Sequence, residues 1–244
     1  MDTTEPTWPA LLVADWEDTR DTLHLWTQMV GKLRLALTPR VNHWWNVPLY
    51  VDARGLTTSL MPCGAHGLEV RFDFFAHELA FERTDGARRT MALEPRSVAD
   101  FYREFTEVLG ELEVPARIHP MPVEIAGAIP FADDETHASY DADAVHRFWL
   151  TLVPAARVLG AFRAEWDGKA SPVHFFWGAF DLAESRFSGR TARCARRSIP
   201  RPCCSTSCGR PTAPAPRPAG GRRRWIPRLS PPGPRACRGD AEIS

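Results

Sequence analysis

The fold is decided by residues 69–74, which read EVRFDF and alternate polar and apolar side chains without a break. Strict alternation is typical of a β-strand that has one buried face and one face in water. The same pattern continues from Leu79, through an Asp-Gly turn at 85–86, towards Leu93. We therefore predict neighbouring antiparallel strands with one solvated face in this part of the chain.

Other extended runs lie on both sides of this stretch. Residues 47–51 and 56–60 are short apolar runs, and the sequence between them, DARG, has the composition of a turn. Residues 171–178 and 180–187 are apolar on both faces, which predicts two strands in the centre of a sheet. A further short strand is expected around 123–125, within a proline-rich passage.

Three stretches have the spacing of amphipathic helices. The first covers residues 17–37, with Asp15 as its N-cap and Pro39 as its stop signal. Its apolar residues recur at intervals of three and four, at Leu23, Trp26, Val30, Leu33 and Leu37. The charged residues off this stripe are Arg20, Lys32 and Arg34.

The second helix opens at Ser97, whose spacing to Asp100 is close to that of a capping box. Its predicted buried residues are Val98, Phe101, Phe105, Val108 and Leu109. The third helix is expected over 141–166, with Pro154 kinking or splitting it. Its predicted inward residues are Val145, Phe148, Trp149, Leu152, Ala156, Leu159 and Phe162. These elements predict an α+β fold, an antiparallel sheet with its helices segregated to one side.

The composition changes sharply near Arg190. Residues 191–244 contain twelve Arg against two acidic residues, a net charge of +10, which leaves 18 basic and 28 acidic residues, a net charge of −10, in residues 1–190. Ten Pro and five Gly also lie in those last 54 residues, with few large aliphatic side chains. Such a segment cannot bury enough apolar surface to offset its chain entropy. We therefore expect an α+β domain over 1–190 and a disordered tail over 191–244.

A shift of reading frame in the gene would explain the composition of the tail. The chain contains 28 Arg and two Lys, the usage of a GC-rich gene, and such a gene read out of frame encodes mostly the residue types of the tail. We hypothesise a frameshift near Arg190 that truncates the domain and leaves its sheet incomplete at the C-terminus. A truncated sheet has an unpaired edge and an exposed apolar face, which predicts poor solubility.

Two functional interpretations of the tail have less support. Its five cysteines could bind a metal, but no C-x-x-C pair exists and no histidine follows Arg190. The Arg run at 222–224 could contact nucleic acid, but the tail has neither interleaved aromatic residues nor an amphipathic helix pattern. Neither a metal nor a nucleic-acid partner is expected.

Charge and motifs narrow the function classes further. The chain has no net charge and no run of eighteen apolar residues, and its N-terminus, MDTTEP, does not resemble a secretory signal. A cytoplasmic protein without a membrane partner is therefore expected. The sequence lacks the motifs of nucleotide-cofactor sites, zinc hydrolases, serine hydrolases and EF-hands, so no cofactor is expected.

Aromatic residues beside polar ones mark the candidate site. The two clusters contain Asn42, His43, Trp44 and Trp45, and His174, Trp177 and Asp181. The functional hypothesis is an aromatic cleft that binds a small apolar or planar molecule, with His43 and His174 as polar anchors or acid–base groups. Such a protein could be an enzyme. The alternative is a non-catalytic interaction or structural protein whose tryptophans and histidines are core packing.

The remaining polar candidates are assigned to structure. The side chains weighed as metal ligands are His43, His137, His146 and His174 with Asp73, Asp133 or Asp181. The spacing between His137 and His146 matches no ligand rule, so no metal is expected. The strand face that carries Glu69, Arg71 and Asp73 is expected to be a salt-bridged outer face rather than a catalytic pair. Residues 133–135 are expected to form a solvated loop, and Cys63 has no apparent activating base.

Several motifs of the chain are specific. They are residues 8–11 (WPAL), 16–28 (WEDTRDTLHLWTQ), 41–45 (VNHWW), 171–178 (SPVHFFWG), 180–182 (FDL) and 186–190 (RFSGR). These motifs resemble an uncharacterised bacterial family known as domain of unknown function 5996, over about residues 8–190. The resemblance supplies no activity. It implies that the C-terminal part of the family is missing from this chain, in line with the frameshift hypothesis.

Overall fold

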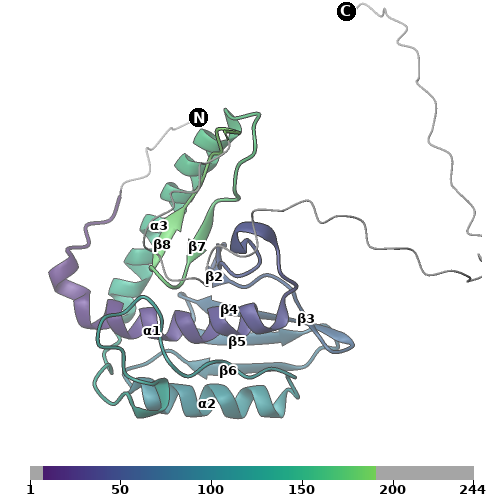
Figure 1. Ribbon diagram of the computed structural model, residues 1–244. Coiled ribbons are helices and arrows are strands. Elements are labelled where there is room, and N and C mark those ends of the chain that lie inside the picture. The colour runs from purple at the N-terminus through teal and green to yellow at the C-terminus, as the bar shows by residue number, and fades with distance from the viewer. Residues whose placement is uncertain (1–7, 191–244) are drawn as a thin grey trace, which may run out of the picture. The chain divides into compact units, whose positions relative to one another are not determined.

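The computed structural model describes residues 8–190, so the predictions for 191–244 lie outside the described residues. Its helices are α1 (Val13–Leu37), α2 (Val98–Glu111) and α3 (Ala142–Ala164), with short 3-10 turns η1 (Asn42–Trp44) and η2 (Phe131–Asp133). Its strands are β1 (Tyr50–Val51), β2 (Gly55–Thr57), β3 (Met61–Cys63), β4 (His66–Asp73), β5 (Glu78–Arg83), β6 (Arg88–Ala92), β7 (His174–Phe176) and β8 (Asp181–Ala183). The predicted α+β fold is confirmed, and Figure 1 shows α1 and α2 running alongside the strands of the main sheet.

The main sheet is antiparallel and is built around β4. Its six strands follow the order β1-β2-β4-β5-β6, and β3 also pairs with β4. The predicted alternation on β4 is confirmed, because Leu68, Val70 and Phe72 are fully buried. Glu69 and Arg71, which alternate with them, stay partly exposed. The hydrophobic pattern therefore fixes which face of the sheet meets the core.

The run predicted at 56–60 is divided. β2 ends at Thr57, because Ser59 adopts a left-handed φ of 53° that a strand does not tolerate. Thr58 bridges the break: its backbone N–H donates to Val70 O at 2.9 Å, and its hydroxyl accepts from Val70 N–H at 2.9 Å. The chain then resumes pairing with β4 as β3, a strand that the sequence pattern did not predict.

α1 begins earlier than predicted and is more fully buried. Its N-cap is Leu12, so the assignment of Asp15 as the N-cap is wrong. Trp16 interrupts the helical dihedrals, with φ −140° and ψ 15°, and the uninterrupted part starts at Glu17, as the periodicity predicted. Lys32 and Arg34, which lie off the apolar stripe, are only 6% and 7% exposed, because neighbouring elements cover α1 on more than one side.

α2 and α3 largely follow their sequence signals. Ser97 caps α2 by accepting a hydrogen bond from Asp100 N–H at 3.1 Å, and Asp141 caps α3 by accepting from Ala144 N–H at 3.0 Å. The predicted stripe of α2 is buried throughout. Pro154 was expected to kink or split α3, and the helix runs without a break through it, so a split is wrong.

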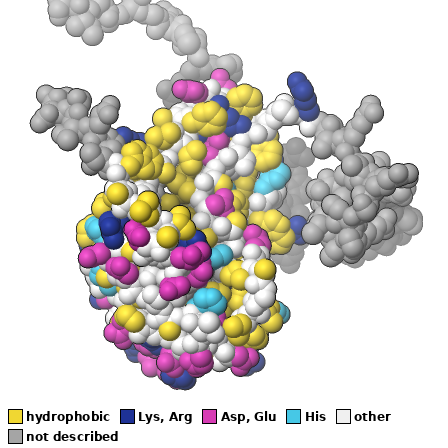
Figure 2. Space-filling view, turned by 90° about the vertical axis from the view of Figure 1, so that its left-hand side faces the viewer, with side chains coloured by type: hydrophobic (Ala, Val, Ile, Leu, Met, Phe, Trp, Pro, Cys, Tyr) yellow, Lys and Arg dark blue, Asp and Glu magenta, His cyan; other side chains and the backbone are white. Residues whose placement is uncertain are grey.

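The C-terminal half of α3 is more exposed than predicted. Phe162, expected to point inward, is 47% exposed. The exposed apolar residues of α3 are Leu150, Val153, Val158, Phe162 and Trp166, the last lying just beyond the helix end. Figure 2 shows hydrophobic side chains gathered on the upper part of the molecule's surface. The poor solubility expected from an exposed apolar face stays a prediction.

β7 and β8 form their own two-stranded antiparallel sheet, so the prediction of central strands is wrong. This hairpin stands beside α3 in Figure 1. It is joined to the chain before β1, where the N–H of Leu49 donates to Phe175 O at 2.9 Å and the N–H of Phe175 donates to Leu49 O at 2.8 Å. Residues 123–125 form an irregular loop instead of the predicted strand. Within 8–190, no helix is long and apolar enough to cross a membrane.

Candidate functional site

A pocket of about 430 Å³ lies where α1, η1, the loop around residue 124 and the β7–β8 hairpin meet. We call it the tryptophan pocket. It is lined by Leu35, Trp44, Val47, Val123, Glu124, Phe176, Trp177, Gly178, Ala179 and Asp181. Its walls are therefore mostly apolar and aromatic, and its charged lining residues are two carboxylates.

Trp177 is held against α1 by a glycine. A Cβ added to Gly31 would lie 2.2 Å from two atoms of the Trp177 ring, so only a glycine lets the ring pack this closely. The indole N–H of Trp177 donates to Val47 O at 2.9 Å, and the side chain is 7% exposed. Gly31 therefore fixes the position of one aromatic wall.

The loop wall of the pocket is held by Gln28. This fully buried side chain of α1 donates from Nε2 to Val123 O at 2.8 Å, and its Oε1 accepts from Val123 N–H at 2.8 Å. The amide thus pairs with both backbone groups of Val123, as a neighbouring strand would. Because Val123 is followed by Glu124, Gln28 also positions the carboxylate that enters the pocket.

The hairpin wall is held by a histidine of α1. His24 donates from Nε2 to Gly178 O at 2.9 Å, and burial lowers the pKa of His24. Its ring also packs against Phe180, with ring centres 5.1 Å apart, and Phe180 stacks on Phe148 of α3. α1 and α3 together therefore fix the β7–β8 turn, which contributes Gly178 and Ala179 to the lining.

The two carboxylates reach the pocket from different segments. Glu124 has a left-handed φ of 60°, and its carboxylate lies over Gly178, since a Cβ there would be 2.9 Å from Oε1. Asp181 begins β8, and both side chains belong to exposed residues. A non-glycine residue with positive φ is uncommon, and such strain is often found at functional sites.

Trp44 forms the outer aromatic wall. It is 51% exposed and also has a left-handed φ, 59°. The guanidinium carbon of Arg40 lies 4.9 Å from the centre of its ring, within the range of a cation–π contact. Trp44 is therefore a half-exposed indole in a left-handed turn at the edge of the pocket.

The structure brings three of the predicted site residues together: Trp44, Trp177 and Asp181 all line the pocket. His43 points elsewhere, with Nε2 at 2.7 Å from Lys169 Nζ and its ring near Phe187. Trp45 shares that second cluster, its ring centre 5.2 Å from that of His43. Asn42 contributes its backbone O to Trp45 N–H at 3.4 Å. Neither histidine of the hypothesis belongs to the pocket lining.

His174 is a core side chain. It is 1% exposed, and its Nδ1 is buried without a hydrogen-bond partner among the described residues. Its ring packs edge-on against Phe176, with ring centres 4.4 Å apart. Burial lowers the pKa of His174, so the folded chain holds it neutral.

Replacing His174 by phenylalanine should therefore reduce the acid sensitivity of the fold. Burial lowers the pKa of His24, His77 and His174, whereas the unfolded chain protonates histidine near pH 6.5. The free energy of unfolding consequently falls as the pH drops below about 6.5, by at most about 1.4 kcal/mol per pH unit for each histidine. Urea denaturation at pH 7.5 and 5.5 should show a smaller loss for His174→Phe than for the unchanged chain. Equal losses would contradict this assignment.

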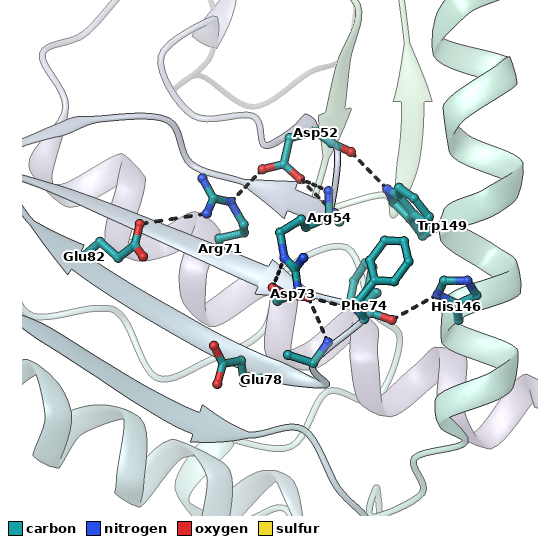
Figure 3. A network of polar contacts seen from close by, with 12 residues as sticks. Asp52, Arg54, Arg71, Asp73, Phe74, Glu78, Glu82, His146 and Trp149 are labelled. Atoms are coloured by element: carbon teal, nitrogen blue, oxygen red, sulfur yellow. Dashed lines mark hydrogen bonds and ion pairs between the residues drawn. The ribbon is translucent and has the colours of Figure 1, made fainter.

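A polar network covers the solvated side of the main sheet (Figure 3). Arg71 bonds to Asp52 and to Glu69, both at 2.7 Å, and Asp73 pairs with Arg54. Asp73 also accepts hydrogen bonds from two backbone N–H groups of the following turn. The expected salt-bridged face is therefore present, and each of its carboxylates has a structural partner.

The other polar candidates also have structural partners. Asp134 is 1% exposed and accepts from His137 Nδ1 at 2.8 Å, so the expectation of a solvated loop at 133–135 is wrong for this residue. His146 bonds through Nδ1 to Phe74 O at 3.1 Å. Cys63 is buried, and burial raises the pKa of its thiol. Within 8–190, no group of three His, Cys, Asp or Glu side chains is placed to hold a metal ion.

Sequence reasoning missed most of the pocket. The lining residues outside the predicted set are Leu35, Val47, Val123, Glu124, Phe176, Gly178 and Ala179. Glu124 was missed because residues 123–125 were predicted to form a strand. One signal was available: a glycine at position 31, inside an otherwise regular helix, indicates close approach of another group.

Comparison with known proteins gives one result. A family model described as "Family of unknown function (DUF5996)" matches residues 8–206, which is more than half of the chain and runs past Arg190. Among curated proteins, and among solved structures, no match is found.

Proposed function

The chain belongs to the family of unknown function DUF5996, and we propose that it binds a small organic molecule in the tryptophan pocket. One observation carries the proposal: Trp44 and Trp177, from two separate aromatic clusters of the sequence, line the same pocket. Its volume of about 430 Å³ lies in the range of small-molecule sites, which are mainly apolar with a few polar groups.

The pocket has few groups for chemistry. Glu124 and Asp181 are the titratable side chains of its lining, so a proton transfer in the pocket would use one of them. The acid–base role first considered for His43 and His174 does not fit this site, because neither histidine is part of the lining.

A structural role without a ligand is the second candidate. It is favoured by the burial of Trp177, whose indole N–H already bonds to Val47 O. In that case the aromatic clusters serve packing alone. Replacing Trp44 distinguishes the ligand-binding role from the structural role, because a half-exposed side chain contributes little to a core.

A fragment screen by ligand-observed NMR tests the proposal. Fragments that bind the unchanged chain should bind Trp44→Ala at least about fivefold more weakly, since an aromatic anchor in a pocket typically contributes more than about 1 kcal/mol. Trp166→Ala is the matched control, because Trp166 is also exposed but lies outside the pocket. Equal fragment binding to the two variants, or no fragment binding, would favour the structural role.

We also propose that the protein works in the cytoplasm, and that residues 191–244 are the product of a frameshift. The arginine-rich usage of the chain and the break in composition at Arg190 support the second proposal. The nucleotide sequence across codons 180–250 tests it: a continuation of the family pattern in another frame is expected. A single intact frame, found again on resequencing, would contradict it.

A further inference from the structure

We infer that the ligand of the tryptophan pocket is a small organic cation, an alkyl or aryl ammonium ion. This inference rests on the proposed function and adds the ligand's charge and class. Three features of the lining support it: its charges, its aromatic residues and its small number of oxygen ligands for a metal ion.

The charges of the lining have one sign. Glu124 and Asp181 are its ionisable residues, and the lining contains no Lys, Arg or His. Both residues are acidic and exposed, so an anionic ligand would meet repulsion on two sides. An ammonium ion would instead gain charge-assisted hydrogen bonds.

The walls are suited to a cation with an organic body. Three aromatic residues, Trp44, Phe176 and Trp177, line the pocket, and the ring of tryptophan is the strongest cation–π partner. The structure already contains one such contact, because the guanidinium of Arg40 lies over the Trp44 ring. Leu35 and Val47 add apolar surface for the uncharged part of a ligand.

Arg40 acts against this attraction. It is not part of the lining, but its positive charge lies beside Trp44, 4.9 Å from the ring centre. The lining itself contributes two carboxylates and no basic side chain.

A metal cation fits the pocket poorly. Calcium and magnesium need six or more oxygen ligands, from the protein or from water, in a polar site. This lining offers two carboxylates, and its other side chains are apolar or aromatic. The combination of aromatic walls and carboxylates matches an organic ammonium ion better.

Three probes of similar shape and different charge test the inference: 2-phenylethylammonium, 2-phenylethanol and 3-phenylpropanoate. Each probe is titrated with the full chain, and binding is measured by ligand-observed NMR. The ammonium ion should bind at least about tenfold more tightly than the alcohol, and the carboxylate should bind most weakly. Raising the salt concentration should weaken binding of the ammonium ion and leave the alcohol unchanged.

Single replacements show which carboxylates attract the ammonium ion. Glu124→Gln and Asp181→Asn should each weaken binding of the ammonium ion about three- to tenfold, with no change for the alcohol. Glu107→Gln is the matched control, because Glu107 is an exposed residue of α2 outside the pocket. Thermal unfolding of each variant shows whether the fold is retained.

The outcomes separate the inference from the proposed function. If the alcohol or the carboxylate binds as tightly as the ammonium ion, and binding still depends on Trp44, the charge inference is overturned and the small-molecule site stands. If the ammonium ion fails to bind at all, the inference is overturned as well. The proposed function fails only when no fragment of any charge shows binding that depends on Trp44.

Discussion

Replacing Gly31 by alanine is expected to lower the free energy of unfolding by about 2 kcal/mol, although alanine is the better helix former. The reason is the contact with Trp177, because the new Cβ would lie 2.2 Å from atoms of that ring. α1 is buried on several sides and cannot move away, so the indole must leave its position. The variant should therefore also lose the aromatic wall that Trp177 gives to the pocket.

Urea denaturation measures this effect against two matched glycines. Gly110 in α2 and Gly160 in α3 are also helical, and among the described residues an added Cβ at either position would have no atom within 4 Å beyond its chain neighbours and the backbone of its own helix. Alanine at those two positions should raise the free energy of unfolding by up to about 1 kcal/mol, the gain in helix propensity alone. A Gly31→Ala variant as stable as these controls would contradict the packing of Trp177 on α1.

Replacing Gln28 by methionine should cost about 1–3 kcal/mol of stability and abolish ligand binding. The thioether has a similar length but cannot pair with the N–H and O of Val123, so two backbone groups lose their partner. The loop that carries Glu124 would then be free to leave the pocket. Chemical denaturation and the fragment titrations above measure the two effects separately.

Thr27→Val is the control for this variant. Thr27 is also fully buried, but its hydroxyl donates to His24 O within the same helix at 2.7 Å. Its loss should cost about 1 kcal/mol and leave the pocket intact, since no other segment depends on it. If Gln28→Met kept full ligand binding, the loop around Glu124 would not be positioned by α1.

The elements with a strict period could be predicted from the sequence. The alternation of residues 69–74 marks β4 because a strand of a sheet with one face on the core buries the side chains of that face, which are every second residue. The buried apolar residues of α2 and its Ser97 cap could be predicted as well, since both are properties of the helix itself. Such local signals do not depend on what the rest of the chain does.

Burial of polar side chains could not be predicted from the sequence in the same way. Lys32 and Arg34 lie off the apolar stripe, yet other segments cover them, and the hydrogen bond from Arg34 Nε to Asn46 O joins α1 to the chain before β1. Asp134 is buried because three N–H groups, two of the backbone and one of His137, satisfy its carboxylate. These partners come from tertiary structure and turn geometry, which a period does not encode.

The candidate site was predicted in part, by two of its tryptophans and by Asp181. Their clusters stood out by composition, but the histidines beside them face other neighbours, because successive residues of a turn or strand point in different directions. Glu124 joins the site through a loop held by α1, a contact between residues far apart in the sequence. A polar residue that reaches a pocket from a distant loop is thus harder to predict than an aromatic cluster of the sequence.

Fluorine NMR of the chain labelled with 5-fluorotryptophan tests whether a small molecule binds between Trp44 and Trp177. Each tryptophan gives one resonance, assigned by single replacement with phenylalanine. On addition of 2-phenylethylammonium or 2-phenylethanol, the resonances of Trp44 and Trp177 should shift together in a saturable way, while that of Trp166, outside the pocket, stays in place. Saturable shifts confined to other tryptophans, or none for any fragment of the screen, would contradict a small-molecule site between Trp44 and Trp177.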